Sequence, residues 1–474
     1  MSKGLKYALY GIWALDVLGL ILAYIFAGTV CCDEFEHLRM SYLVSQGYMP
    51  YRDFFEHHHP LLWYMFAPLM KILPQNFTLA YYLARGVAFL FSCGTFYFIY
   101  LIFKNFFNDG KLFIYFFIAV MVFYPSWYGY IFFKPDVFER CFYFMGLYYF
   151  LKYEKSKIRS FLTMCGLCFT ISFLFLQTAV FEIIPIIILL MYMLYKDNKL
   201  LKDYLIAAFP SVILLSVCAI ILYATNSWED YYRLNWVFNG LVFNAANEYV
   251  SKGSIIHAFC IHLAAGFAAF IWMYRSKINN KTVNIIFFLF VCSVIQHLYF
   301  TAFYAHYLIP AFILCSILVS YAVRYILSRE NKVIVRLSVA FLILCLILNF
   351  VTLAIKNNVY MQKQMRMINQ NSEDIVITVS GNLYAIYNPV ISYYVMSSGI
   401  SVMDNVLFNR DKKYDINELI KKYRPKYLDY DNSEEEHILS ENNRGKYRKI
   451  SPENLQHYEQ LSSYLWQRKD TLLQ

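Results

Sequence analysis

The sequence predicts an α-helical multi-pass membrane protein that carries a small soluble α/β domain at its C-terminal end. Hydrophobic residues make up 59% of the 474-residue chain and charged residues only 16%, and the mean hydropathy is +0.43. One soluble core cannot bury so much apolar surface. From about residue 356 charged residues become frequent and apolar runs shorten to strand length. We therefore expect a membrane domain at 1–355 and a soluble α/β domain at 356–474.

Eleven apolar segments come near the roughly 20 residues that a helix needs to cross a bilayer. They lie at about 7–30, 78–103, 112–130, 138–151, 160–178, 179–195, 204–224, 255–274, 283–303, 306–327 and 334–355. The first follows Lys3 and Lys6 and is not followed by a small-residue cleavage site, so we expect a retained helix rather than a signal peptide. The pair between 160 and 195 is either one broken helix or two short ones that meet at Gln177-Thr178.

The distribution of lysine and arginine predicts the orientation, because these residues are retained on the cytoplasmic side. With the N-terminus inside, the inner segments hold eighteen of them and the outer loops seven. This places loops 31–77, 125–140 and 225–254, together with the C-terminal domain, on the outer face. The net charge of +10 then reflects membrane topology, and nucleic-acid binding is not expected.

The C-terminal domain shows short α/β patterns. Residues 374–381 (DIVITVSG) are typical of a buried strand that ends in a turn. Residues 416–423 (INELIKKY) predict a short amphipathic helix, and 427–430 (YLDY) a second strand.

The first outer loop, residues 31–77, concentrates ionisable residues beside the membrane, where they are costly and therefore indicate a site. Its acidic segment 33–37 (DEFEH) directly follows a transmembrane helix, which suits a general base that must stay hydrated. Asp33 is the first candidate, with Glu34 beside it. If the segment is extended, Glu36 returns to the side of Asp33. The other interpretation is that these acids only keep the loop in water and orient the chain.

Three consecutive histidines in 50–60 (PYRDFFEHHHP) offer ligands for zinc or another divalent ion. In an extended chain successive side chains face opposite ways, so only His57 and His59 would share a metal. Hydrogen bonding to a substrate or structural packing also explains the triplet. We expect no required cofactor, and keep a divalent ion at His57 and His59 as the alternative.

The order of residues in this loop resembles the first outer loop of GT-C class glycosyltransferases. The resemblance rests on DEFEH at 33–37, GYMPYRDFF at 47–55 and HPLLWY at 59–64. This class of integral membrane enzymes includes protein O-mannosyltransferases and lipid A aminoarabinose transferases. Two weaker elements follow in order, FKPD at 133–136 and HYLIP at 306–310. The resemblance implies a GT-C fold for the membrane part.

The resemblance implies a role for each polar residue of these elements. Asp33, the leading residue of the acidic pair, would be the base that deprotonates the acceptor, with Glu34 as its catalytic neighbour. A histidine, His59, stands where relatives often carry a lysine beside the lipid phosphate. The residues expected at the donor phosphate are Arg52, His59, Lys134, His306 and Tyr307. The residues expected at other parts of the substrate are Glu36, His37, Asp53 and Glu56.

These observations favour a glycosyltransferase at the outer face of a bacterial inner membrane. It would move a sugar from a polyprenyl-phosphate-linked donor to a hydroxyl of a glycan, lipid or protein acceptor in a single displacement, which predicts inversion. One alternative is a transporter or flippase of lipid-linked sugars, although we find none of the internal repeats common in such proteins. Another is a membrane metalloenzyme that uses His57 and His59, although the helical His-Glu-x-x-His zinc motif is absent from the sequence.

Overall fold

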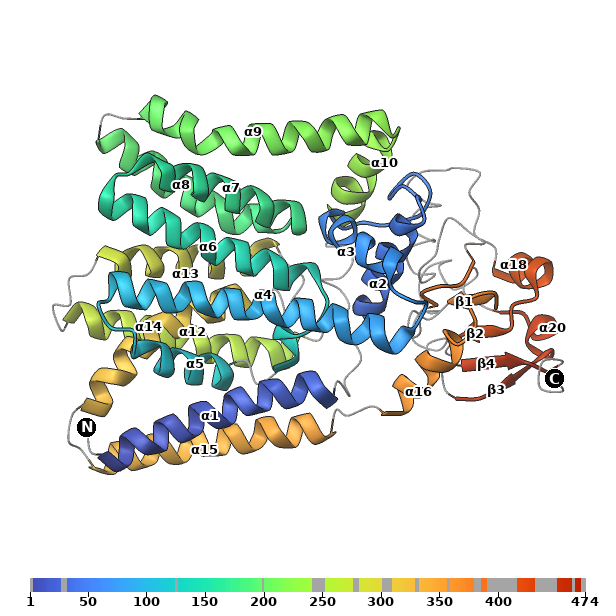
Figure 1. Ribbon diagram of the computed structural model, residues 1–474. Helices are drawn as coiled ribbons and strands as arrows, with labels where there is room; N and C mark the ends of the chain where they lie inside the picture. The colour runs from blue at the N-terminus through green and yellow to red at the C-terminus, as the bar shows by residue number, and fades with distance from the viewer. Residues whose placement is uncertain are drawn as a thin grey trace. The chain divides into compact units, whose positions relative to one another are not determined.

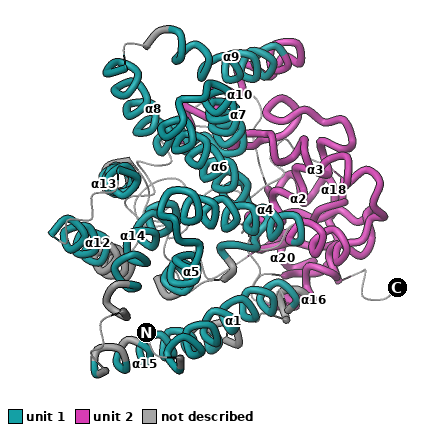
Figure 2. The backbone as a smooth tube through the Cα atoms, turned by 60° about the vertical axis from the view of Figure 1, so that its left-hand side comes forward, with its two compact units in different colours: residues 1–27, 86–220, 240–357 teal, residues 28–85, 221–239, 358–474 magenta. Residues whose placement is uncertain are grey.

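The computed structural model describes most of the chain and divides into two compact units (Figures 1 and 2). The described residues are 3–26, 32–123, 127–197, 200–240, 252–275, 281–300, 309–328, 332–355, 359–378, 385–389, 416–430, 450–462 and 465–469. The first unit comprises Met1–Ala27, Gly86–Ile220 and Gly240–Asn357. The second comprises Gly28–Arg85, Ile221–Asn239 and Asn358–Gln474. Segments far apart in the sequence therefore build each unit.

Long helices follow the predicted spans in order. They are α1 (Lys3–Phe26), α4 (Phe77–Phe106), α5 (Leu112–Phe123), α6 (Pro135–Ser156), α7 (Arg159–Phe175), α8 (Ala179–Lys196), α9 (Leu200–Ala224), α12 (Lys252–Arg275), α13 (Lys281–Phe300), α14 (Ile309–Ser328) and α15 (Lys332–Ile355). Each predicted span thus contains a helix. The uncertain pair at 160–195 consists of two helices, α7 and α8, which are separated at residues 176–178.

Four helices among the described residues are long and apolar enough to cross a membrane: Gly4–Ile25, Phe77–Phe106, Ala179–Lys196 and Lys202–Ala224. Shorter apolar helices include Leu112–Met121, Arg159–Phe175 and Ile309–Arg324. Because so much apolar surface lies on long helices, the chain fits a multi-pass membrane protein.

The helices of the first unit enclose a large apolar cluster, and residues of α1 and α5 form a second, smaller one. α6 packs against α7, α14 against α5, α12 and α13, and α1 against α15. At Gly166 of α7 the contact with α9 is so close that an added Cβ would lie 1.9 Å from the carbonyl oxygen of Ala207. A small residue is therefore required there, as is common where membrane helices approach closely.

The second unit contains short helices and a small sheet. Its helices are α2 (Cys32–Ser45), α3 (Leu61–Ile72), α10 (Trp228–Tyr232), the π-helical turn η2 (Arg233–Phe238), α16 (Val359–Ile368), α18 (Ile416–Tyr423) and α20 (Pro452–Leu455). α2 packs against α3. These two helices and the loop between them form the described part of segment 31–77, the predicted first outer loop.

The sheet has four strands in the order β1-β2-β4-β3 (Figure 1). The strands are β1 (Val376–Thr378), β2 (Tyr427–Asp429), β3 (Tyr458–Gln460) and β4 (Leu465–Arg468). β1 and β2 run parallel with Ile377 opposite Leu428, and the other neighbours are antiparallel. The strands predicted within 374–381 and 427–430 and the helix predicted at 416–423 are confirmed. That residues 356–474 form a separate domain stays a prediction.

Candidate active site in the first outer loop

The acidic segment 33–37 forms the beginning of helix α2. Asp33 and Glu34 lie in its first turn, where the helix dipole stabilises negative charge. Residues three and four apart share one face of a helix, so Asp33 lies on the side of Glu36 and His37. The segment is helical rather than extended, and the helical repeat brings Glu36 to that side. Asp33 is partly exposed, whereas Glu34 and Glu36 are buried.

Glu34 is held in a buried ion pair with Arg85 of α4. The guanidinium donates from Nε to Oε1 at 2.9 Å and from Nη2 to Oε2 at 2.5 Å. Neither side chain is exposed to solvent, and the guanidinium also lies 4.4 Å from the centre of the Tyr81 ring. Both oxygens of the Glu34 carboxylate are thus occupied by the arginine, whereas Asp33 is partly exposed. Of the predicted acidic pair, Asp33 is therefore better suited to act as a base.

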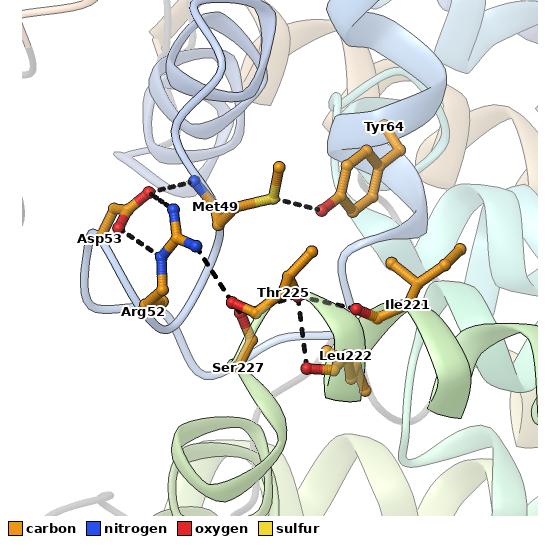
Figure 3. A network of polar contacts seen from close by, with 8 residues as sticks. All are labelled: Met49, Arg52, Asp53, Tyr64, Ile221, Leu222, Thr225 and Ser227. Atoms are coloured by element: carbon orange, nitrogen blue, oxygen red, sulfur yellow. Dashed lines mark hydrogen bonds and ion pairs between the residues drawn. The ribbon is translucent and has the colours of Figure 1, made fainter.

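The loop after α2 makes a strained turn that carries Arg52 and Asp53 (Figure 3). Tyr51 is fully buried with a φ of 69°, a left-handed conformation that is unusual for a bulky residue. Asp53 accepts from the backbone N–H of Met49 at 2.7 Å and from Nε of Arg52 at 2.7 Å. Arg52 Nη1 donates to the carbonyl oxygen of Thr225 at 3.1 Å. The predicted phosphate ligand Arg52 thus lies at the exposed edge of the loop, held beside residue 225.

Four side chains gather beyond this turn in a group that we call the imidazole–carboxylate cluster: Glu36, Glu56, His57 and His58. Each offers one donor atom, and these atoms all lie within 4.8 Å of one another. Glu56 Oε1 lies 2.7 Å from His58 Nδ1 and 3.5 Å from His57 Nδ1. Glu36 Oε1 lies 3.8 Å from His58 Nδ1. These are the described residues that could hold a metal ion.

The charged groups of the cluster shift one another's pKa values. Burial raises the pKa of Glu56, but His58, His57 and His37 outweigh it and lower that pKa to about 2. Burial and then the charge of His58 lower the pKa of His57 to about 3, against the opposite effects of Glu56 and Asp33. At neutral pH we therefore expect an ionised Glu56 and a neutral His57.

Hydrogen bonds from neighbouring elements fix the backbone of the histidines. Tyr51 donates its hydroxyl to the carbonyl oxygen of His58 at 2.7 Å, and Asn239 donates to that of His57 at 2.8 Å. Asn235 of η2, with its amide turned to match its neighbours, donates to both carbonyls at 3.3 and 3.2 Å. A π-helical turn of this kind is frequent at functional sites. The histidine side chains are thus presented by a constrained backbone.

His37 and His59 lie at the border of the cluster. Trp63 of α3 donates its indole N–H to His37 Nδ1 at 3.1 Å, and the His37 ring meets the His58 ring edge-on at 5.0 Å. His59 is buried and its Nε2 lies 3.0 Å from the hydroxyl of Tyr231. The chain bends at His58 instead of continuing extended. For this reason the group contains His57 with His58, rather than with His59 as the alternating pattern led us to expect.

The remaining predicted ligands lie outside this loop. Lys134 caps the N-terminal end of α6 in the first unit and is partly buried. His306 and Tyr307 lie outside the described residues. The structure therefore brings together Asp33, Glu36 and His37 with the 56–58 segment, and leaves the predicted roles of Lys134, His306 and Tyr307 as predictions.

The C-terminal segment contacts helix α2. Arg39 of α2 is buried and donates from Nη1 to the carbonyl oxygen of Ile386 at 2.7 Å. Burial lowers the pKa of Arg39 to about 10. The rings of Tyr42 and Tyr387 meet edge-on at 5.2 Å. Residues 386–387 thus support the helix that carries Asp33.

Several residues of the site were not found from the sequence. Arg85 had a signal, since it is a charged residue inside an apolar span and such charges are usually paired. His58 was set aside because the loop was treated as extended. Tyr231, Asn235 and Asn239 had no local signal, because their contacts depend on a segment 170 or more residues away in the chain.

The fold has a counterpart among solved structures. No family model and no curated protein matches the sequence. The crystal structure of ArnT from Cupriavidus metallidurans bound to undecaprenyl phosphate matches with a TM-score of 0.55 at 10% sequence identity, covering 80% of this chain and 83% of ArnT. The GT-C resemblance that the first outer loop suggested is confirmed at the level of the fold: this chain has the fold of ArnT, a GT-C lipid A aminoarabinose transferase.

Proposed function

We propose that this protein is a GT-C type glycosyltransferase of the bacterial inner membrane. It transfers a sugar from a polyprenyl-phosphate-linked donor to the hydroxyl group of an acceptor at the outer face, with inversion at the anomeric carbon. The observation that carries the proposal is the contrast within the acidic pair. Asp33 is partly exposed at the N-terminal end of α2, while Glu34 is bound at both oxygens by Arg85.

Asp33 is suited to deprotonate an acceptor hydroxyl. The first turn of a helix holds its carboxylate in place, and partial exposure lets a substrate reach it. It lies close enough to His57 for its charge to affect the pKa of that ring. The acceptor oxygen would attack the anomeric carbon as its proton passes to Asp33. The bond to the lipid phosphate would break in the same step.

The leaving lipid phosphate needs positive charge or hydrogen-bond donors. Arg52 projects from the exposed edge of the same loop, and His59 lies beside Tyr231. Lys134, at the N-terminal end of α6, combines a cationic side chain with the positive end of a helix dipole. We assign these three residues to the phosphate, together with His306 and Tyr307 from the sequence pattern. Glu36, His37, Asp53 and Glu56 would orient the sugar and the acceptor.

A lipid-linked donor fits the class of fold. ArnT was solved with undecaprenyl phosphate, a polyprenyl phosphate without its sugar. The long apolar helices of this chain would hold such a tail within the bilayer, while its phosphate reaches the loop. A donor of this kind supplies its own leaving group, so the reaction requires no nucleotide at the outer face.

The test is sugar transfer by the purified full chain, with Asp33→Asn compared with wild type. Asparagine keeps the shape of the side chain but loses its basicity, so we expect the rate to fall by at least about 10²-fold. Glu229→Gln is the matched control, because Glu229 is an exposed acid of the same unit whose partner is Arg233. The anomeric configuration of the product, read by NMR, tests inversion.

Two outcomes would count against the proposal. Unchanged transfer by Asp33→Asn would remove Asp33 as the base. Movement of intact lipid-linked sugar across vesicle membranes, without cleavage of any lipid-linked donor supplied, would favour a flippase instead.

A further inference from the structure

The imidazole–carboxylate cluster has the composition of a metal site. Two carboxylates, Glu36 and Glu56, and two imidazoles, His57 and His58, supply oxygen and nitrogen donors without a thiolate. First-row divalent ions, and zinc in particular, favour such ligands. From this convergence we infer that the loop binds one divalent cation of the zinc class, held by Glu36, Glu56, His57 and His58.

The distances suit a small tetrahedral site. Donor atoms bound to zinc at about 2.0–2.2 Å lie roughly 3.4 Å apart in a tetrahedron. The separations in the cluster are 2.7 Å for Glu56 and His58, 3.5 Å for Glu56 and His57, and 3.8 Å for Glu36 and His58. Shifts of about 1 Å or less would bring these three pairs to that spacing.

A buried carboxylate oxygen of Glu56 provides an independent observation. Glu56 is 0% exposed, and within the described part of the chain its Oε2 has no hydrogen-bond partner. Such a group costs free energy unless something compensates it. A cation bound by both oxygens of Glu56 would supply that compensation.

Residues around the cluster hold its ligands in place by hydrogen bonds. Tyr51, Asn235 and Asn239 fix the carbonyl groups of His57 and His58, so the two rings are presented on a rigid backbone. Outer groups of this kind orient metal ligands and raise affinity. His59 is excluded from the set, because its Nε2 faces Tyr231.

The ion would join two parts of the loop. Glu36 belongs to α2, one turn after Asp33, and the other three ligands belong to the segment 56–58. Binding would replace the contact between Glu56 Oε1 and His58 Nδ1, release to solvent any proton carried on that nitrogen, and fix the segment against α2. In this role the cation positions the site and does not depend on the identity of the sugar or the acceptor.

The first experiment measures metal in the purified full chain in detergent. We expect about one zinc equivalent per chain by elemental analysis. We also expect a chelator-stripped sample to regain one equivalent when titrated with Zn²⁺ alone. Co²⁺ added to stripped wild type should give the visible absorption of a site with nitrogen ligands, a readout that requires no variant. A chain that takes up neither ion with a defined stoichiometry would overturn the inference.

Variants locate the site. Glu56→Gln and His58→Gln should each weaken Zn²⁺ binding about 10- to 100-fold or more, and Glu36→Gln should do so with less disturbance of the fold. His457→Gln, which changes an exposed histidine of the C-terminal segment, should leave binding unchanged. If the three ligand variants bind Zn²⁺ as wild type does, the ion lies elsewhere and the inference is wrong. Since these readouts do not involve transfer, they stand or fall separately from the role of Asp33.

Discussion

Two groups of buried charges in the second unit are built in different ways. In the Glu34–Arg85 pair, one guanidinium binds both oxygens of one carboxylate, at 2.9 and 2.5 Å. In the imidazole–carboxylate cluster, two carboxylates meet two imidazoles, and Oε2 of Glu56 has no hydrogen-bond partner within the described residues. In the pair both oxygens of Glu34 are bound, whereas within the described residues one oxygen of Glu56 has no hydrogen bond.

This difference separates a structural role from a binding role. The ion pair holds α2 against α4 and occupies both oxygens of Glu34. An incomplete group in a constrained backbone keeps capacity for a cation or a substrate. The two acids that adjoin in the sequence, Asp33 and Glu34, fall on opposite sides of this division, since Asp33 shares the helix face that leads to the cluster.

The largest expected effect comes from breaking the ion pair of Glu34 and Arg85. Arg85→Met leaves the Glu34 carboxylate buried without its partner, and we expect a loss of about 3–5 kcal/mol in unfolding free energy. Unfolding of the purified protein in detergent measures it. The double variant Glu34→Leu with Arg85→Met should recover most of the loss, because it removes both charges. Equal instability of the single and double variants would contradict this account of the pair.

Removal of metal from the wild-type protein tests the imidazole–carboxylate cluster. A ligand present at about 100 times its dissociation constant stabilises the folded state by about 2.7 kcal/mol. We therefore expect the thermal midpoint to fall by several degrees after chelation and to return with Zn²⁺. In Glu56→Gln the response of the midpoint to Zn²⁺ should be much smaller. A response of equal size in that variant would show that the stabilising ion binds at another place.

The backbone that presents the histidines should be sensitive to Asn239. Its side chain donates to the carbonyl oxygens of His57 at 2.8 Å and Asn235 at 2.9 Å. Asn239→Ala removes both of these hydrogen bonds, and we expect a loss of about 2 kcal/mol together with weaker Zn²⁺ binding. Gln46→Ala, at an exposed position after α2, is the control and should change stability by less than about 0.5 kcal/mol. Unaltered Zn²⁺ affinity in Asn239→Ala would argue against a positioning role.

The smallest effect on stability is expected at the exposed pair of Arg52 and Asp53. Its side chains are 42% and 26% exposed, so Arg52→Ala should cost less than about 1 kcal/mol. If Arg52 contacts the donor phosphate, transfer should nevertheless weaken, mainly through a higher KM for the lipid-linked sugar. A variant with lowered stability and unchanged KM would reverse this assignment.

The membrane helices could be predicted from the sequence because hydropathy and length are local properties. Every apolar segment contains a helix, including the pair at 160–195 that meets at Gln177-Thr178. The strands within 374–381 and 427–430 could be predicted for the same reason, since each is a short apolar run. Their order, with β4 between β2 and β3, could not, because it depends on pairing between distant segments.

The candidate site was predicted in its residues but not in its geometry. The prominence of Asp33 and the ligand types of the histidine triplet follow from residue chemistry alone. Because the chain bends at His58, the cluster contains His58 and not His59. The prediction assumed an extended chain, in which side chains alternate, and so did not allow for this bend. The left-handed backbone at Tyr51, which precedes this bend, could not be predicted because the position is not a glycine.

By itself the sequence determined the class of protein, the helical segments and the loop in which polar chemistry is concentrated. These depend on composition and short-range pattern, which the chain carries at every position. Only the tertiary structure decided that Arg85 forms an ion pair with Glu34 and that Tyr231 forms a hydrogen bond with His59. It also decided that Glu36 meets Glu56, His57 and His58. Each of these contacts joins segments that only folding brings within hydrogen-bond distance, where burial makes the partner of a charge the main determinant of its role.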